Sequence, residues 1–335
     1  MISKLLQIYV VDTIAMIDAP ILTIAIPNFN YDKYLKRSIE SALAQQSDDI
    51  EILVSDNSSS DTSWDIISKF SDYRLKTWRQ DKNIGLYQNW NFLLHHSKGR
   101  YFKLLQSDDW LELNFMDKFH EILAKASDKD IVAVLLGYTV LDERSNVSIV
   151  SSPSIPVHQN IPNEFIPNAN FDAVLKSFQY SMPTLNILNS KRLKSVGGYV
   201  PEDAMRSDSI AFSKVLTSSP FGYVVSCNTP VAVTRIHKNN DRMRYSRFEA
   251  SRDEWIYLSE LKIIASVKSV VKLNILLSIS KSQALSRLLL DFLYDRNVKK
   301  LINGLKWFVE KKILLSSLLS LPVGIFVLLR DKLNR

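Results

Sequence analysis

The fold class is decided by residues 21–61, which read ILTIAIPNFNYDKYLKRSIESALAQQSDDIEILVSDNSSSD. Two short apolar runs, residues 21–27 and 50–55, each end in a cluster of polar residues, which is the pattern of a buried strand that opens into a loop. Between them, apolar residues recur at helical spacing over residues 34–44. Strand, helix and strand in this order predict a parallel sheet covered by helices.

The same alternation continues along the chain. Further helices are expected at residues 62–70 and 87–96, and further strands at 75–78, 101–105 and 131–138. Residues 151–170 are rich in Pro, Asn and Ser and predict a long surface loop. From about residue 247 helical periodicity prevails. The sequence therefore predicts an α/β body, with a mostly parallel sheet and flanking helices, followed by an α-helical C-terminal region.

Composition limits the class of protein. With 335 residues, 46% of them hydrophobic and 23% charged, the chain is an ordinary folded protein with room for about two domains. Its single cysteine, Cys227, excludes an internal disulfide framework. Because no Cys/His cluster has the spacing of a zinc site, a structural zinc module is excluded as well, and a reducing compartment fits best.

The net charge of +7 is unevenly distributed. Residues 231–335 hold 20 Lys and Arg against 9 Asp and Glu, so the C-terminal third is basic and the remainder is slightly acidic. Such a block is typical of contact with nucleic acid, anionic lipid or a phosphorylated ligand, although a solvated face without a partner is an alternative. No nucleic-acid motif accompanies the charges, so nucleic acid is not expected as a partner.

Both ends of the chain carry apolar segments. Residues 313–329 contain no charge, but at 17 residues they are shorter than the roughly 20 that a spanning helix needs, and Pro322 and Gly324 interrupt them. Attachment at the membrane surface is the expected role, while a packed helix in the core or an oligomer and a true span remain alternatives. Residues 1–20 predict a packed or membrane-proximal extension, since Asp12 interrupts the run and no cleavage site follows.

Three polar clusters mark the candidate site. They follow predicted strands and comprise residues 27–30, 56–61 and 107–109. In open parallel sheets ligands bind at the carboxyl ends of the strands, where such loops converge. The chain has 8 glycines and neither a Gly-x-Gly-x-x-Gly nor a Walker motif, so the usual dinucleotide and NTPase cradles are excluded.

The acidic residues in these loops allow two interpretations. Adjacent carboxylates such as Asp108 and Asp109 repel each other and suit a hard divalent cation that also binds diphosphate oxygens. Alternatively, they cap a helix over residues 110–119. Likewise, Asp56 and Asp61 either contact a ligand or close a turn and cap the helix that begins at residue 62.

The order of these motifs resembles that of the family 2 glycosyltransferases over about residues 21–240. The resemblance is carried by the strand end Pro27-Asn28-Phe29-Asn30, the helical residues 38–45, the strand end 55–61, Asn83-Ile84-Gly85, and Ser97-Lys98-Gly99-Arg100-Tyr101 leading to Ser107-Asp108-Asp109. It implies a GT-A fold with a nucleotide-binding half at about 21–110 and an acceptor half at 111–240. An extension at 1–20 precedes this domain, and a basic helical tail at 241–335 follows it.

The resemblance also implies roles for individual residues. Asp56 would hydrogen-bond the nucleotide base, and Mg²⁺ or Mn²⁺ would sit on the diphosphate, with Asp109 as the favoured direct ligand. The family often shows Asp-x-Asp-Asp here, and Gln106 replaces the first Asp. The residues expected to bind the donor are Pro27, Asn28, Asn30, Asp56, Asn57, Asn83, Gly85, Ser107, Asp108 and Arg235, and those expected to bind the metal are Asp109, Asp108 and His237.

A catalytic base is implied by the segment that follows Val196-Gly197-Gly198-Tyr199, which resembles the family's Gly-Gly-Phe turn. Asp208 would take this role, with Ser207 in the place of the usual Glu, and Asp203 is the rival. The alternative interpretation of Asp208 is a cap on a helix over residues 210–216.

The implied activity is inverting transfer of a sugar from a nucleotide sugar, expected to be a UDP-sugar, to a hydroxyl of a glycan or lipid-linked acceptor. The setting would be synthesis of surface polysaccharide, such as O-antigen or capsule, at the cytoplasmic face of a bacterial membrane. A binding or scaffold subunit that has lost turnover stays open because of Gln106 and Ser207. A nucleotidyltransferase is disfavoured because no Gly-rich phosphate loop is present.

Overall fold

The computed structural model describes residues 19–126, 129–145, 147–151, 165–167, 182–199, 207–218 and 222–238, together with a few isolated residues between 285 and 309. The chain divides into two compact units. One comprises Met1–Pro201 and Ala211–His237, and the other comprises Glu202–Ile210 and Lys238–Arg335. Of the predicted N-terminal extension only residues 19 and 20 are described. The apolar segment 313–329 and all but a few residues of the basic tail also lie outside the described residues.

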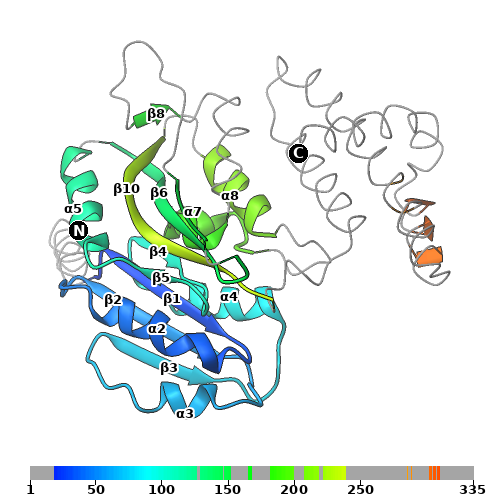
Figure 1. Cartoon of the computed structure of the whole chain (residues 1–335). Coiled ribbons are helices and arrows are strands. Elements are labelled where there is room, and N and C mark those ends of the chain that lie inside the picture. Colours follow the sequence, from blue (N-terminus) through cyan, green and yellow to red (C-terminus); the bar gives the residue numbers. More distant parts are fainter. Residues whose placement is uncertain are drawn as a thin grey trace, which may run out of the picture. The chain divides into compact units, whose positions relative to one another are not determined.

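The described strands and helices alternate from β1 to β4, and the order is less regular after that (Figure 1). The strands are β1 (Leu22–Asn28), β2 (Ile50–Asp56), β3 (Leu75–Arg79), β4 (Tyr101–Leu104), β5 (Trp110–Leu111), β6 (Ile131–Asp142), β7 (Val147–Ser151), β8 (Phe165–Pro167), β9 (Asn186–Asn189) and β10 (Tyr223–Ile236). The helices are α2 (Asp32–Leu43), α3 (Ser63–Ile67), α4 (Leu86–His96), α5 (Phe115–Lys125), α7 (Ser190–Ser195) and α8 (Ser207–Thr217), with a 3₁₀ turn, η2 (Pro183–Leu185).

One mixed sheet forms the centre of the first unit, with the strand order β3-β2-β1-β4-β9-β6-β10-β5. Strands β1 to β4 are mutually parallel, as the βαβ pattern predicts. Strand β9 is antiparallel to both β4 and β6, so β6 and its parallel neighbour β10 point the same way as β1. The carboxyl ends of β1, β2, β3, β4, β6 and β10 therefore lie along one edge of the sheet.

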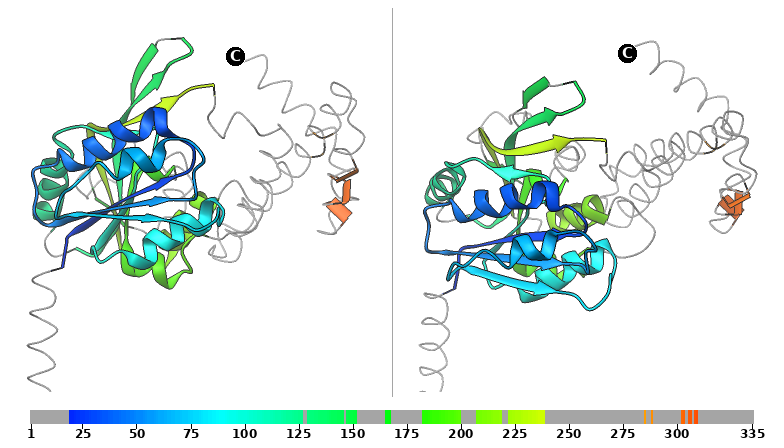
Figure 2. Two further views of the ribbon diagram at one scale, coloured as in Figure 1. Left: turned by 90° about the horizontal axis from the view of Figure 1, so that it is seen from below. Right: turned by 60° about the horizontal axis from the view of Figure 1, so that its bottom comes forward.

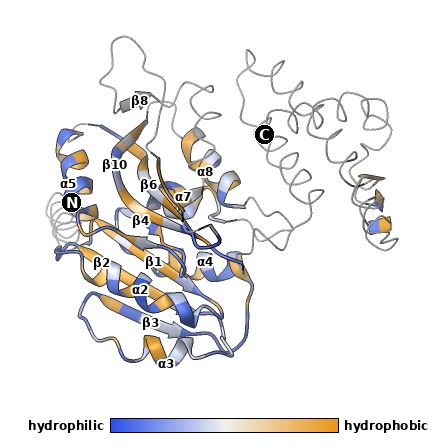
Figure 3. Ribbon diagram, viewed as in Figure 1, coloured by the Kyte–Doolittle hydropathy of each residue, from blue (hydrophilic) through white to orange (hydrophobic). Residues whose placement is uncertain are grey.

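Helices cover both faces of this sheet (Figure 2). Helices α2, α3 and α5 pack their apolar sides on one face, with Leu35, Ile39 and Phe119 among the buried residues. On the other face α4, α7 and the part of α8 that belongs to this unit bury Trp90, Leu193 and other apolar side chains. Because the inner strands face apolar helices on both sides, they are hydrophobic along most of their length (Figure 3). The predicted α/β class with flanking helices is confirmed.

One sequence prediction is wrong at a point that matters for the site. The helix predicted over residues 110–119 does not begin at Trp110, because Trp110–Leu111 form the short strand β5, antiparallel to β10. Helix α5 starts only at Phe115, where Phe115, Met116, Phe119 and Ile122 supply the buried side. Asp108 and Asp109 therefore precede a strand, and the interpretation of this pair as a helix cap is excluded.

In the part of the chain that the structure describes, none of the helices combines the length and the apolar character needed to traverse a bilayer.

Candidate active site

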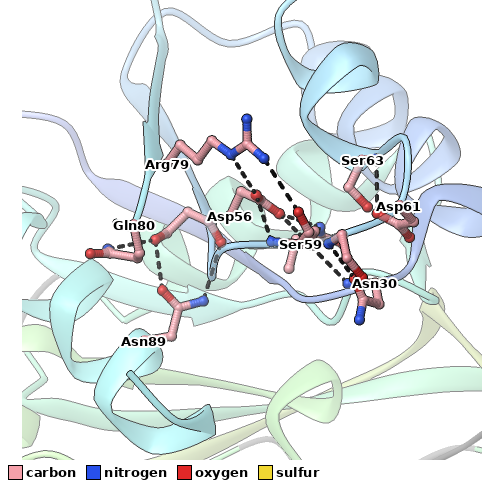
Figure 4. Close-up of polar contacts among 11 residues, drawn as sticks. Asn30, Asp56, Ser59, Asp61, Ser63, Arg79, Gln80 and Asn89 are labelled. Carbon is pink, nitrogen blue, oxygen red and sulfur yellow. Dashed lines mark hydrogen bonds and ion pairs between the residues drawn. The ribbon is translucent and has the colours of Figure 1, made fainter. Parts of the chain in front are cut away.

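The first half of the site is a nest of hydrogen bonds around Asp56, at the end of β2 (Figure 4). Asp56 is completely buried, and its oxygens accept hydrogen bonds from Asn28 Nδ2 (2.8 Å), Ser59 Oγ (2.5 Å) and Ser59 N (3.1 Å). The Arg79 guanidinium, at the end of β3, lies 3.8 Å from Asp56 Oδ2 and donates to the Ser59 carbonyl. Three hydrogen-bond donors and a nearby guanidinium thus compensate one buried negative charge, as a buried carboxylate requires.

The loop after β1 is fastened to this nest. Asn30 has a positive φ of 57°, which an asparagine tolerates. Its backbone N–H donates to Ser59 Oγ (2.9 Å). Its side-chain oxygen accepts the N–H of Ser60 (2.8 Å). Asp61 in turn accepts the Ser63 N–H, as its interpretation as a turn residue predicts, although the N-cap of α3 is Thr62 and not Asp61.

A second loop, between β3 and α4, joins the same cluster through Asn57. Its amide nitrogen donates to Asn83 Oδ1 (3.0 Å) and to the Gly85 carbonyl (3.2 Å), and its oxygen accepts the Ile84 N–H (2.9 Å). Gly85 has a φ of +94°, which L side chains rarely adopt, so the turn into α4 depends on a glycine. The structure therefore brings together seven of the ten residues expected to bind the donor: Pro27, Asn28, Asn30, Asp56, Asn57, Asn83 and Gly85.

The second half of the site is the loop after β4. Ser107 ties this loop to the first half, because its buried hydroxyl donates to the Pro27 carbonyl (2.6 Å). Asp109 is buried, and both of its oxygens are engaged: Oδ1 accepts the backbone N–H of Arg235 (2.8 Å) and Oδ2 accepts the hydroxyl of Thr184. Asp108 is only partly buried, and its Oδ2 lies 3.1 Å from His237 Nε2.

The end of β10 supplies the basic residues of this cluster, Arg235 and His237. The Arg235 side chain donates through Nε to the Asp108 carbonyl (3.0 Å) and forms an ion pair with Glu143, next to the end of β6. Tyr34 of α2 packs on the His237 ring at a centroid distance of 4.5 Å, and the Arg235 guanidinium lies 4.6 Å from the centre of the Tyr34 ring. His237 is thus held in place by a carboxylate and an aromatic ring.

Burial makes the electrostatics of this half unusual. Desolvation, followed by the charge of Asp108, raises the pKa of Asp109 above its ordinary value. Lys103 of β4 is fully buried, and desolvation lowers the pKa of its ammonium group to about 7. Titratable groups with strongly shifted pKa values are concentrated at functional sites. This favours the second half as the chemical centre of the site.

The side chains of this half can hold a divalent cation only if a bound ligand supplies further coordinating atoms. Among the described residues no group of three or more His, Cys, Asp or Glu side chains could by itself hold a metal ion. Asp108 and His237 nevertheless offer a carboxylate and an imidazole within 3.1 Å of each other. A cation that binds a nucleoside diphosphate takes part of its coordination from phosphate oxygens, so two protein ligands at such a site are sufficient.

The predicted base candidates differ in what the structure describes. Asp208 lies in the first turn of α8, which begins at Ser207 and not at residue 210, so Asp208 is inside the helix. Asp203 and the segment before it lie outside the described residues.

Sequence reasoning missed several residues around the predicted ones. Among them are Arg79, Glu143 and Thr184, which contact predicted residues, and Lys103, which contacts Thr184. Arg79 could have been found, because it directly follows the predicted strand 75–78 at the same sheet edge. Lys103 also left a signal, as a lone charge in the apolar run 101–105. No local pattern points to Thr184 or Glu143, which contact the site only through the tertiary fold.

Comparison with known proteins shows similarity to one family and to several solved structures. Residues 23–173 match the model of the family described as "Glycosyl transferase family 2". The chain is 35% identical over 101 residues to the Escherichia coli UDP-Glc:alpha-D-GlcNAc-diphosphoundecaprenol beta-1,3-glucosyltransferase WfaP, a match that covers 30% of this chain and 40% of that protein. The chain spans about two fifths of the length of this and other curated relatives.

Solved structures share the fold over much more of the chain. Staphylococcus aureus TarS in complex with UDP-GlcNAc superposes with a TM-score of 0.61 at 16% identity, over 86% of this chain and 80% of TarS. The mannosyltransferase PcManGT from Pyrobaculum calidifontis, in complex with GDP-Man and Mn²⁺, gives a TM-score of 0.56 at 13% identity, over 90% and 87% of the two chains.

Proposed function

Because residues 23–173 form a glycosyl transferase family 2 domain with a GT-A fold, we propose that this protein transfers a sugar from a nucleotide sugar to an acceptor hydroxyl. The observation that carries the proposal is the convergence of two clusters on one sheet edge. One is the set of hydrogen-bonded polar residues around the Asp56 carboxylate. The other is the group of Asp108, Arg235 and His237, and the hydrogen bond between Ser107 and Pro27 joins the two.

The Asp56 cluster is proposed to hold the nucleoside. Its loops come from the ends of β1, β2 and β3 and present amide, hydroxyl and carbonyl groups, which suit a base and a ribose better than a charged phosphate. UDP-GlcNAc in TarS and the UDP-Glc named for WfaP support a UDP-sugar as the first candidate donor. The GDP-Man in PcManGT makes a GDP-sugar the second.

The second cluster is proposed to hold the diphosphate. Asp108 and His237 would bind Mg²⁺ or Mn²⁺, the latter being present in PcManGT, and Arg235 lies beside them as a fixed positive charge. A bound divalent ion supplies neutralisation of the leaving diphosphate. Asp109, which the resemblance favours as the direct ligand, already accepts two protein hydrogen bonds. We therefore propose that it supports the site from behind while Asp108 faces the ion.

Asp208 is proposed as the general base that accepts the proton of the acceptor hydroxyl, with inversion at the anomeric carbon. General-base assistance is worth about 10²- to 10⁴-fold in rate. Asp208→Asn should therefore lose that factor in turnover and keep donor binding. Asp203→Asn is the matched variant, and an equal loss there with none in Asp208→Asn would move the assignment.

The acceptor and the setting are proposed from the relatives and from charge. WfaP acts, by its name, on a diphosphoundecaprenol-linked sugar, and the C-terminal third of this chain is basic. A lipid-linked or glycan acceptor in surface polysaccharide synthesis fits both. The basic tail would then contact anionic lipid at the cytoplasmic face of the bacterial membrane.

A catalytically inactive subunit that binds nucleotide sugar is the second candidate, favoured by Gln106 and Ser207 in place of acidic residues. Nucleoside diphosphate release from UDP-, GDP- and dTDP-sugars, with and without MnCl₂, separates the two. Manganese-dependent release from one donor class, absent in Asp108→Asn, supports the transferase. Binding without any release, under every donor and with candidate lipid acceptors, would favour the inactive subunit.

A further inference from the structure

Behind the site lies a set of buried hydrogen bonds that begins with a lysine in an apolar environment. Lys103 stands in the middle of β4 with no exposed surface, in a strand whose other residues are all buried and apolar. Lysine is almost never fully buried unless its charge is compensated. Here the compensation comes from three backbone carbonyls, those of Pro183, Thr184 and Asn186, all accepting hydrogen bonds from Lys103 Nζ.

These carbonyls belong to η2 and the first residue of β9, so Lys103 fixes a turn that is 80 residues distant in sequence. Thr184 in this turn is held at both ends. Its carbonyl accepts from Lys103, while its hydroxyl donates to Oδ2 of the buried Asp109. An apolar side chain at position 103 would remove this donor from three carbonyls and the turn would lose its anchor.

The contact continues from Asp109 to the metal-facing residues. Asp109 Oδ1 accepts the Arg235 N–H (2.8 Å), which fixes the end of β10 two residues before His237. Arg235 Nε in turn donates to the Asp108 carbonyl (3.0 Å). Asp109 therefore joins three segments, and the positions of both Asp108 and His237 depend on it.

We propose that Lys103 and Thr184 are positioning residues, a buried clamp that holds Asp109 and through it sets the geometry of Asp108 and His237 for a divalent cation. This inference rests on the proposed function, because it assigns the clamp a role in that same site. Neither residue touches the ligand. Partners of this kind, one shell behind the ligands of a metal, typically change metal affinity by about 10- to 100-fold when removed.

The test is a thermal-shift titration of MnCl₂ on the purified full chain at fixed UDP, repeated with GDP. Thr184→Val keeps the shape and removes the hydroxyl, so the half-saturating Mn²⁺ concentration should rise about 10- to 100-fold. Thr184→Ser restores the hydroxyl and should return close to wild type. Lys103→Met should behave like Thr184→Val, and Lys194→Met, which removes another ammonium group bonded to a backbone carbonyl, that of Ser97, is its control.

The matched control for the threonine is Thr23→Val. Thr23 is equally buried, and its hydroxyl donates to the buried Glu51 (2.7 Å), but at the opposite end of β1. It should lower the thermal midpoint without raising the Mn²⁺ requirement. The threonine variants alone decide the test if Lys103→Met fails to fold.

The outcomes are distinguishable. A wild-type chain without any Mn²⁺-dependent shift, with either nucleotide, overturns the proposed function and the clamp together. If the wild type shows the Mn²⁺-dependent shift and Thr184→Val needs no more Mn²⁺ than Thr23→Val does, the clamp alone is overturned. Equal loss in Thr184→Ser and Thr184→Val also contradicts it, because the hydroxyl would then not be the group that matters.

Discussion

The two halves of the site are built in different ways. The Asp56 nest takes nearly all its hydrogen bonds from residues 28–89, a single stretch of consecutive βα units. The Asp108 cluster instead joins the loop after β4 to Thr184 and to Arg235 and His237, which lie 75 to 129 residues away in sequence. The first half is therefore a local product of strand ends, whereas the second exists only when distant strands have paired.

This difference indicates which half of the site depends more on correct pairing of distant strands. A nest of consecutive loops can form once β1, β2 and β3 are in place. The second cluster requires strands that are distant in sequence to pair: β9 lies between β4 and β6, and β5, which directly follows Asp109, pairs with β10. Variants that act on one half and not on the other test this division.

The largest effect is expected for Asp108→Asn. The amide replaces the charged oxygen beside His237, so a proposed ligand of the cation is lost. Metal-dependent release of nucleoside diphosphate should fall by at least about 100-fold. Asp117→Asn, which changes an exposed acid in the first turn of α5, is the control and should keep full activity. Comparable loss in both would indicate a general electrostatic effect in place of a site.

Asp56→Asn should show the next largest effect, mainly on stability. The asparagine amide turns N–H groups toward the hydrogen-bond donors around position 56, which then lack an acceptor in a fully buried environment. We expect this to lower the free energy of unfolding by about 2–4 kcal/mol. Asp61→Asn is the matched variant in the same loop and should cost about 1 kcal/mol, since this carboxylate only caps backbone N–H groups. Urea denaturation measures both values, and equal losses would contradict the role of Asp56 as the centre of the nest.

Lys103→Met should change the pH dependence of stability. In the unfolded chain Lys103 binds a proton below its ordinary pKa of 10.5, and in the folded chain only below about 7. The unfolded state therefore holds more protons between these values, so the unfolding free energy of the wild type should rise with pH across this window, relative to Lys103→Met, by on the order of 4 kcal/mol.

Denaturation series from pH 7 to 10 measure this difference. Asp109 is the titratable neighbour of Lys103, and because burial raises its pKa, its own ionisation contributes to the same series in both proteins. Lys36→Met, which removes an exposed lysine on α2, is the control and should run parallel to the wild type. Parallel curves for Lys103→Met and wild type would contradict the burial of the ammonium group.

The smallest stability effect is expected for Arg79→Met. Its ion pair with Asp56 is long at 3.8 Å, and the arginine side chain is 48% exposed, so the loss should be below about 1 kcal/mol. Because the guanidinium borders the proposed nucleoside pocket, UDP or GDP affinity should fall more than stability does. Isothermal titration together with urea denaturation compares the two, and a large stability loss without any loss of affinity would assign Arg79 a purely structural role.

The sequence predicted the first half well, because its signals are local. Apolar runs followed by polar clusters identified β1 and β2. The rule that ligands bind at the carboxyl ends of parallel strands was then sufficient to place Asn28, Asp56 and Asn57 together. The same rule applied to β3 would have added Arg79.

The second half was predicted only in part. The family resemblance names Asp108, Arg235 and His237, but the helix expected over residues 110–119 includes Trp110–Leu111, which form the strand β5. Tertiary pairing with β10 overrides that local preference. Thr184 left no signal, since a threonine after a proline has no distinguishing pattern until the fold brings its hydroxyl to Asp109.

The measurement that tests the central claim most directly is isothermal titration of UDP and GDP, with and without MnCl₂, into the wild type, Asp56→Asn and Asp108→Asn. If one ligand bridges the two halves, Asp56→Asn weakens binding by the same factor with and without metal. Asp108→Asn should leave metal-free binding intact and abolish the gain that Mn²⁺ brings. A manganese-dependent gain that survives Asp108→Asn, or the absence of nucleotide binding in the wild type, would contradict the account.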